Sequence, residues 1–119
     1  MKHLLLTTIA AVLVGCGKPS IHHAAKGGNI EAVKQHLNDG ANIELKCVNC
    51  GGTVLGHAAI NGHKELAELL IDSGADVNAK DDDGKPPLDW AIEFKETEIA
   101  DLLRKHGGKT GEELKAEGK

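Results

Sequence analysis

Two cysteines three positions apart are the residues in this chain whose types and spacing most directly suggest chemistry. Cys47 and Cys50 enclose Val48 and Asn49, and a C-x-x-C pair can form a redox-active dithiol or supply half of a zinc site. A zinc site needs four ligands, and no second pair lies at a suitable spacing, although His57 follows. A redox dithiol belongs between a strand and a helix, whereas this pair runs into two glycines. A purely structural role therefore competes with both chemistries.

The seven histidines raise the question of a metal site. His23 and His57 are the pair to consider, because they lie 34 residues apart in a motif that recurs. If the motif repeats on packed neighbours about 10 Å apart, the two rings cannot share one ion, whose bonds to nitrogen are about 2 Å long. The acidic run 81–83 lacks the alternating spacing and distal Glu of a calcium loop. We expect no metal, no cofactor and no catalytic residue.

The N-terminus is organised like a secretory signal. Lys2 and His3 form a basic start, residues 4–14 are apolar or neutral, and residues 13–16 read Leu-Val-Gly-Cys. The run is too short for a membrane-spanning helix, which takes about 20 residues, but it suits a secretory h-region. A buried helix is the alternative, although the run has no polar face. Residues 13–16 resemble the lipobox of bacterial lipoproteins, which implies removal of residues 1–15 and a lipid on Cys16.

This resemblance also implies a location. Several acyl chains on Cys16 would give stable membrane attachment, with residues 16–19 as the lipid-anchored N-terminus. Gly17 stands where the inner-membrane retention signal of lipoproteins has Asp, which favours the outer membrane, facing the periplasm. That compartment is oxidising, so a structural disulfide between Cys47 and Cys50 becomes the favoured interpretation. Two thiols without a role, and a redox or metal function, remain the alternatives.

The charge and aromatic content limit the partners. Once Lys2 has left with the signal, 13 basic and 18 acidic side chains give a formal net charge of −5. Trp90 and Phe94 are the only aromatic residues apart from histidine. With no basic stripe and no aromatic residues interleaved to stack on bases, the sequence excludes nucleic acid as the expected partner.

Three segments of the chain align with one another. An apolar residue followed by Ala three positions later begins at Ile21, Leu55 and Leu88, at offsets of 34 and then 33 residues. A second signal, Gly-Ala followed by Asn or Asp, begins at Gly40 and Gly74. In the second unit Leu66, Leu69 and Leu70 form one apolar helical stripe. Glycines stand just past each such stripe, where a left-handed residue commonly ends a helix; they are Gly40, Gly74 and Gly107.

This pattern resembles the ankyrin repeat, which has a period of 33, a T-P-L-H-x-A motif, a Gly in mid-unit and G-A-D-V-N at the end. The resemblance implies an all-α solenoid of three helix-turn-helix repeats joined by short β-hairpin-like turns. The units would be residues 20–46 as the N-terminal cap, 47–80, and 81–108 as the C-terminal cap. One unit cannot bury its own apolar stripe, so the units stack and leave a concave surface of first helices and turns.

Several residues depart from the family pattern. In the family the His and Thr of the motif brace neighbouring turns by hydrogen bonds. His22 survives only in the first unit and Thr53 only in the second, while Gly56 and Asp89 replace that His elsewhere. Lys95 replaces the mid-unit Gly of the third unit. We therefore expect a different turn or an extended helix there.

The resemblance implies a concave face that binds a protein, with Trp90, Phe94 and Ile60 as the main contacts because aromatic and apolar anchors dominate interfaces. The alternative is that the two aromatic residues cover the end of the core. The expected contact residues are His23, Lys26, Lys46, Val48, Asn49, His57, Ile60, Asn61, Lys80, Asp81, Trp90, Glu93 and Phe94. Residues 109–119 form a polar tail, with a capping-box pattern at Thr110 that predicts only a frayed helical turn.

The sequence thus predicts a membrane-tethered, monomeric, non-enzymatic module that binds an unidentified protein in the periplasm. One alternative is a redox or metal-handling lipoprotein that uses Cys47 and Cys50 with His57. Another is a soluble effector directed at a host.

Overall fold

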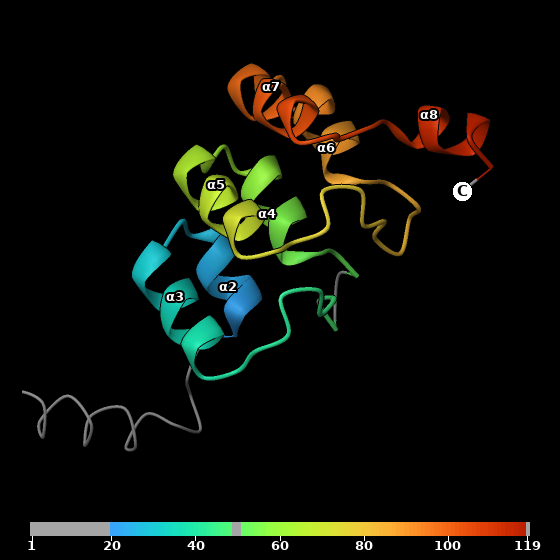
Figure 1. The fold of residues 1–119 in the computed structure, drawn as a ribbon. Helices are drawn as coiled ribbons and strands as arrows, with labels where there is room; N and C mark the ends of the chain where they lie inside the picture. Colours follow the sequence, from blue (N-terminus) through green and yellow to red (C-terminus); the bar gives the residue numbers. More distant parts are fainter. Residues whose placement is uncertain (1–19, 49–50, 119) are drawn as a thin grey trace, which may run out of the picture.

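The computed structural model describes residues 20–48 and 51–118, which contain helices and connections but no strand. Three helix pairs stack in chain order, as Figure 1 shows. The first helices of the pairs are α2 (Ile21–Lys26), α4 (Val54–Ile60) and α6 (Pro87–Glu93); the second helices are α3 (Ile30–Asn38), α5 (Lys64–Asp72) and α7 (Thr97–Lys105); α8 (Gly111–Ala116) follows. The all-α solenoid predicted from the sequence is confirmed.

Side chains and glycines at the helix ends explain why the elements begin and end where they do. Ser20 caps α2, Asn29 caps α3 and Thr53 caps α4, each accepting a hydrogen bond from a backbone N–H of the first turn. The glycines predicted to terminate the second helices all have positive φ: Gly40 at 92°, Gly74 at 99° and Gly107 at 89°. The residue after each glycine donates its backbone N–H to a carbonyl of the last helical turn. That carbonyl would otherwise have no hydrogen-bond partner within the helix.

Both helices of each pair contribute to the core, and the first helices also place small residues where they pack against one another. Ala25, Ala59 and Ala91 have no exposed surface, so the first helices can stack closely against one another. Larger apolar side chains of the core come from the second helices (Val33, Leu66, Leu70, Ile99 and Leu103) and from the first helices (Ile21, Val54, Leu55 and Leu88). Since each pair buries its stripe against its neighbour, the core belongs to the stack and not to any single repeat.

The turn inside each repeat is the same three times. Gly28 and Gly62 have φ of 71° and 73°, and Lys95 takes the same left-handed conformation with φ of 59°. In all three repeats the residue after this position donates its N–H to the carbonyl of an Ala in the first helix. The expectation of a different third turn or a longer helix is therefore wrong. A side chain at this φ costs about 1 kcal/mol relative to glycine.

The C-terminal tail is a docked helix, which differs from the frayed turn expected from sequence. The capping box of Thr110 and Glu113 is present. Leu114 is only 3% exposed, and Arg104 on α7 pairs with Glu113 at 2.7 Å. These hydrogen bonds and the neighbouring guanidinium lower the pKa of the Glu113 carboxyl. The helix α8 thus packs onto the end of the third repeat.

The predicted signal (1–15), its lipid site Cys16 and the short segment 16–19 lie outside the described residues, as do Asn49 and Cys50. Among the helices of the described ranges, none is long and apolar enough to cross a bilayer.

Candidate functional site

Two long connections lie beside the first helices and form one wall of the candidate site. The first connection comprises residues 39–53 and the second comprises residues 73–86; Figure 1 shows both running out on the same side of the helix stack. They are joined to each other, because Asp82 donates its backbone N–H to the carbonyl of Gly51 at 3.1 Å and its carboxylate lies 3.6 Å from Lys46 Nζ. Together with α2, α4 and α6, they make up the face that the repeat pattern predicts to be concave, which is called the concave face below.

The first connection ends in a closed loop that carries the C-x-x-C pair. The N–H of Cys47 donates to the carbonyl of Gly52 at 2.8 Å, and the N–H of Gly51 donates to the carbonyl of Cys47 at 2.7 Å. Val48, on this loop, is 97% exposed. Within residues 20–48 and 51–118, no three His, Cys, Asp or Glu side chains come together as metal ligands. The oxidation state of the pair stays a prediction, since Cys50 is not described.

His57 does not lie on the accessible face where the repeat alignment placed it. Its side chain is buried, with 5% of its surface exposed. A Cβ atom on Gly52 would lie 3.0 Å from its ring, and the His22 ring meets it edge-on at 5.5 Å between centroids. The first connection folds over this histidine, so it fills the space beneath the loop and offers no contact surface.

The surroundings of His57 keep it neutral. Burial, followed by the positive charges of Lys26 and His22, lowers the pKa of the His57 ring from 6.5 to about 4. His22 is held by the same connection, because its Nε2 lies 2.6 Å from the carbonyl of Leu45 and can only donate to it. The bracing by this histidine that the family pattern implies is therefore present in the first repeat.

Trp90 occupies the position in the third repeat that His57 occupies in the second, but it is only half-buried. Its indole N–H donates to Oδ2 of Asp81 at 2.6 Å. The Nζ of Lys85 lies 4.5 Å from the centre of the Trp90 ring, and the Phe94 ring lies 6.1 Å away at an angle of 49°. These contacts fix the indole where α6 meets the second connection.

Asp81 holds Trp90 in place and is not a free contact group. Its Oδ1 accepts the backbone N–H groups of Asp83 and Lys85, both at 2.9 Å, while Oδ2 accepts from Trp90. Sequence reasoning placed this carboxylate among the partner contacts. The structure shows that both of its oxygens already bind the chain, so it acts as a positioning residue. The acidic run followed by glycine is the signal that could have indicated such a turn.

The other expected contact residues are distributed over the accessible face. Phe94 is 48% exposed, and neither aromatic residue belongs to the buried core. Asn61 donates from its side chain to the carbonyl of His57 at 2.8 Å. The exposed members of the set are His23, Lys26, Lys46, Val48, Asn61, Glu93 and Phe94, and the half-buried members are Ile60, Lys80, Asp81 and Trp90.

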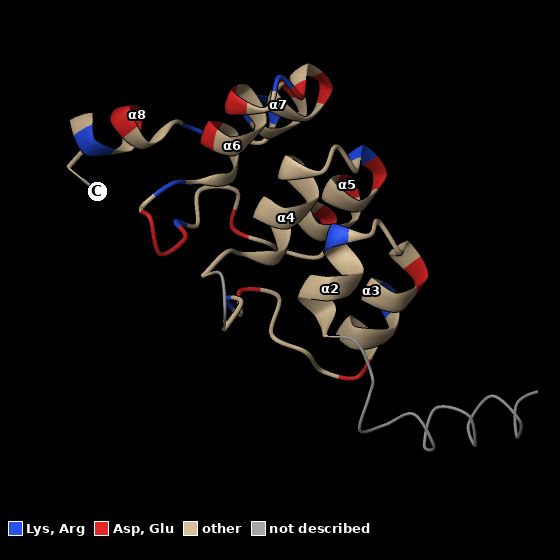
Figure 2. Cartoon of the chain, turned by 180° about the vertical axis from the view of Figure 1, so that it is seen from behind, with Lys and Arg blue, Asp and Glu red and all other residues tan. Residues whose placement is uncertain are grey.

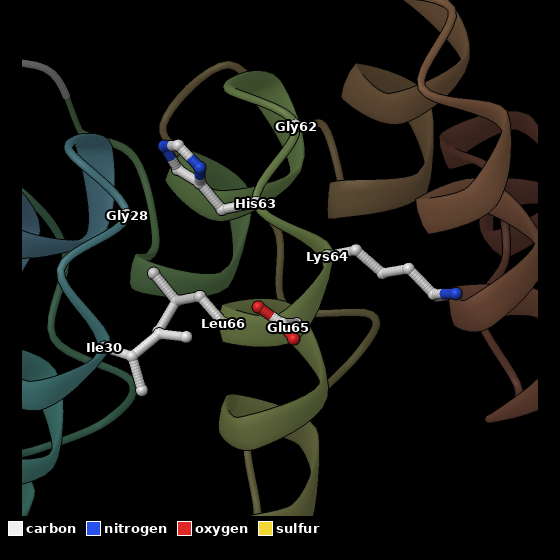
Figure 3. A pocket seen from close by; sticks show the side chains of 7 residues that line it. All are labelled: Gly28, Ile30, Gly62, His63, Lys64, Glu65 and Leu66. Atoms are coloured by element: carbon white, nitrogen blue, oxygen red, sulfur yellow. The ribbon is translucent and has the colours of Figure 1, made fainter.

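The end of the helix stack away from the connections carries a second concavity, shown in Figure 3. It is lined by Gly28, Ile30, Gly62, His63, Lys64, Glu65 and Leu66. The His63 ring covers Gly28, where a Cβ atom would lie 2.7 Å from it, and its Nε2 donates to the carbonyl of Lys26 at 2.9 Å. In Figure 3 the side chain of Lys64 extends away from this cleft. The cleft is thus a seam between two repeats, braced by His63.

One contact that the sequence did not suggest involves Asp89. It replaces the motif histidine in the third repeat, and its carboxylate accepts the backbone N–H of Gly111 at the start of α8, at 3.1 and 3.2 Å. Because Asp89 and α8 lie 22 residues apart in sequence, no local pattern linked them. The departure from the family motif thus serves the attachment of the C-terminal helix.

Three stacked helix pairs, with their connections on one side, define a scaffold built from repeats. A family model described as ankyrin repeats (3 copies) matches residues 21–113. The match spans most of the chain, and this chain belongs to the ankyrin repeat family. Membership of this family indicates protein–protein binding and is typical of non-enzymatic modules. No curated protein matches the chain.

Proposed function

We propose that this chain is a membrane-tethered module that binds a protein partner, without forming a covalent bond, through the concave face. The observation that carries the proposal is the pair of Trp90 and Phe94. The indole is fixed by Asp81 and Lys85, and the neighbouring phenyl ring is left half-exposed. Rigid aromatic side chains next to solvent lose little conformational freedom on binding, and such residues contribute most to interface energies.

The chemistry of the face favours recognition over catalysis. Its charged groups are mostly paired within the chain: Lys85 lies 3.1 Å from Glu93 and Lys46 lies 3.6 Å from Asp82. The hydrogen bond that Lys85 donates to the Glu93 carboxylate also raises the pKa of Lys85, which therefore remains a cation and not a base at neutral pH. Apart from these paired charges, the face offers side chains on packed helices that a partner could contact.

The membrane tether rests on the lipobox resemblance of residues 13–16. Helix α2 begins at Ile21, capped by Ser20, so only residues 16–19 would separate a lipid on Cys16 from the first repeat. A segment of that length reaches at most about 14 Å, and the repeats would lie close to the membrane surface. We propose the periplasmic side of the outer membrane and a monomeric chain.

The tether is tested by fractionating cells that express the wild type or Cys16→Ser. The proposal expects the wild type in the detergent-extracted membrane fraction and the variant in the aqueous fraction. A wild type that is recovered in the aqueous fraction would remove the tether from the account and favour a soluble effector.

The binding role is tested by chemical crosslinking in intact cells followed by mass spectrometry. We expect a crosslinked partner with the wild type, and its loss in the double variant Trp90→Ala, Phe94→Ala. The matched control is Glu68→Ala, an exposed position on α5 of the second-helix layer, which should retain the partner. A partner that survives the double variant, or is lost in the control, would refute binding through this face.

A further inference from the structure

The charges on the concave face are not evenly distributed along the stack. Lys26 is exposed at the end of α2 and forms no salt bridge within residues 20–48 and 51–118. His23 lies exposed one turn earlier on the same helix. Glu44 on the first connection is engaged within the chain, because it accepts the backbone N–H of Asp76 at 2.7 Å. At the other end of the stack, Glu93 on α6 is paired with Lys85 and Asp83 is exposed on the second connection. The first repeat is therefore the cationic end of the face.

Apolar surface occupies the middle and far parts of the face. Helix α4 contains no charged residue, and in Figure 2 it is uncoloured, whereas α2 carries one basic segment. Ile60 ends this helix half-buried, and Trp90 and Phe94 continue the apolar surface on α6. Lys26 and Ile60 occupy equivalent positions in consecutive repeats. A cation thus precedes two apolar contact points along the stack.

The spacing of the repeats predicts how far apart the matching side chains of a partner would lie. Packed helices lie about 8–10 Å apart, and an extended chain advances about 3.3 Å per residue. One repeat therefore corresponds to about three residues of an extended segment. An acidic side chain opposite Lys26 would place a residue three positions away opposite Ile60. A residue six positions away would lie opposite α6, where Glu93 holds the equivalent position, is paired with Lys85 and is flanked by Trp90 and Phe94.

We infer that the partner presents an extended acidic–apolar segment, with a carboxylate at Lys26 and His23 and with aliphatic side chains about three and six residues further along at Ile60 and at the Trp90–Phe94 pair. This inference rests on the proposed binding function and adds to it the chemistry and orientation of the ligand. The cationic end selects the carboxylate, and the paired charges at the far end leave the apolar contacts to dominate there.

The experiment uses the whole chain and labelled seven-residue peptide pools in fluorescence anisotropy at low ionic strength. The acidic pool has Asp or Glu at one end, Leu at the fourth and seventh positions and Ser, Thr or Gly elsewhere, in both chain directions. The second pool has Lys in place of the acidic residue. The wild type should bind the acidic pool about tenfold more tightly, a preference that falls with salt.

Charge reversal makes the test specific. Lys26→Glu should reverse the preference between the two pools, whereas Lys34→Glu, an exposed position on α3, should leave it unchanged. Equal binding of the pools by the wild type, or the same response in both variants, would overturn the inference. If binding is equal but disappears in Trp90→Ala, Phe94→Ala, the binding function stands and only the acidic pattern falls. If neither pool binds and no crosslinked partner depends on the aromatic pair, the proposed function itself falls.

Discussion

His57 and Trp90 occupy equivalent positions in consecutive repeats and have different environments. His57 is buried under the first connection, in contact with the His22 ring. Trp90 meets the second connection through the hydrogen bond from its indole N–H to Asp81 and through Lys85, and its ring lies beside the half-exposed Phe94. The helical register is the same in both repeats, so the difference comes from the connections.

The first connection is one residue longer than the second, which is why the offset between the first two repeats is 34 and not 33. The extra length closes into the loop that begins at Cys47, and Gly52 approaches the His57 ring closely because it has no side chain. Sequence periodicity thus identifies which residues are equivalent. The path of the connection decides which of them a partner can reach.

We expect the largest difference in stability between variants of the buried His57 and variants of its exposed equivalent, His23. His57→Ala should lower the free energy of unfolding by about 2–4 kcal/mol, because it empties a packed site under the first connection. His23→Ala, at the same position of the first repeat, should change it by less than about 0.5 kcal/mol. Urea denaturation of both variants measures this; similar losses would mean that His57 is not packed as described.

Acid should lower the free energy of unfolding because it protonates the His57 ring. Folding favours neutral His57, whose pKa falls from 6.5 to about 4, so its contribution is complete above pH 6.5 and is lost as the pH drops towards 4. The wild type should lose about 2–3 kcal/mol more over this interval than His57→Leu. Urea titrations between pH 7.5 and 4 test this, and parallel declines in the two proteins would contradict it.

The position of the Trp90 indole should depend on its hydrogen bond to the Asp81 carboxylate. Asp81→Asn can present an amide NH2 where Oδ2 accepts from the indole, and it removes a charged hydrogen bond that contributes about 1.5–3 kcal/mol. We expect a loss of about 1.5 kcal/mol and a red shift of the fluorescence of Trp90, the only tryptophan. Asp83→Asn, on the exposed side of the same turn, is the control and should shift neither quantity measurably.

The smallest effect should come from the turn inside the third repeat. Lys95→Gly should stabilise the protein by about 0.5–1 kcal/mol, because it relieves a side chain at positive φ. The equivalent change in the opposite direction, Gly62→Ala, should destabilise it, since φ is 73° and a Cβ atom would lie 2.9 Å from Glu96. Thermal unfolding measures both, and equal shifts in one direction would refute the common turn.

Much of the fold could be predicted because it depends on short-range periodicity. The stripe at Leu66 and Leu70, the helix-ending glycines and the capping box at Thr110 are local signals, and each is found in the structure. The burial of His57 and the engagement of Asp81 depend on how a connection folds back onto a helix. No spacing in the sequence encodes that contact.

The turn at Lys95 and the docked tail also could not be predicted from the local sequence. The residue type at Lys95 argued against a left-handed turn, but the packing of α6 against α7 imposes it. The polar tail offered only Leu114 and Ala116 as apolar residues, and its docking depends on Asp89 and Arg104 from other parts of the third repeat. Tertiary contacts override local preference at both places.

The contrast between the covered second repeat and the open third repeat is tested most directly by photo-crosslinking in intact cells. The photoreactive residue p-benzoylphenylalanine is placed at position 94 on the concave face or at position 68 on the exposed side of α5. The account predicts a partner adduct from position 94 and none from position 68. An adduct from position 68 alone, or equal adducts from the two positions, would contradict it.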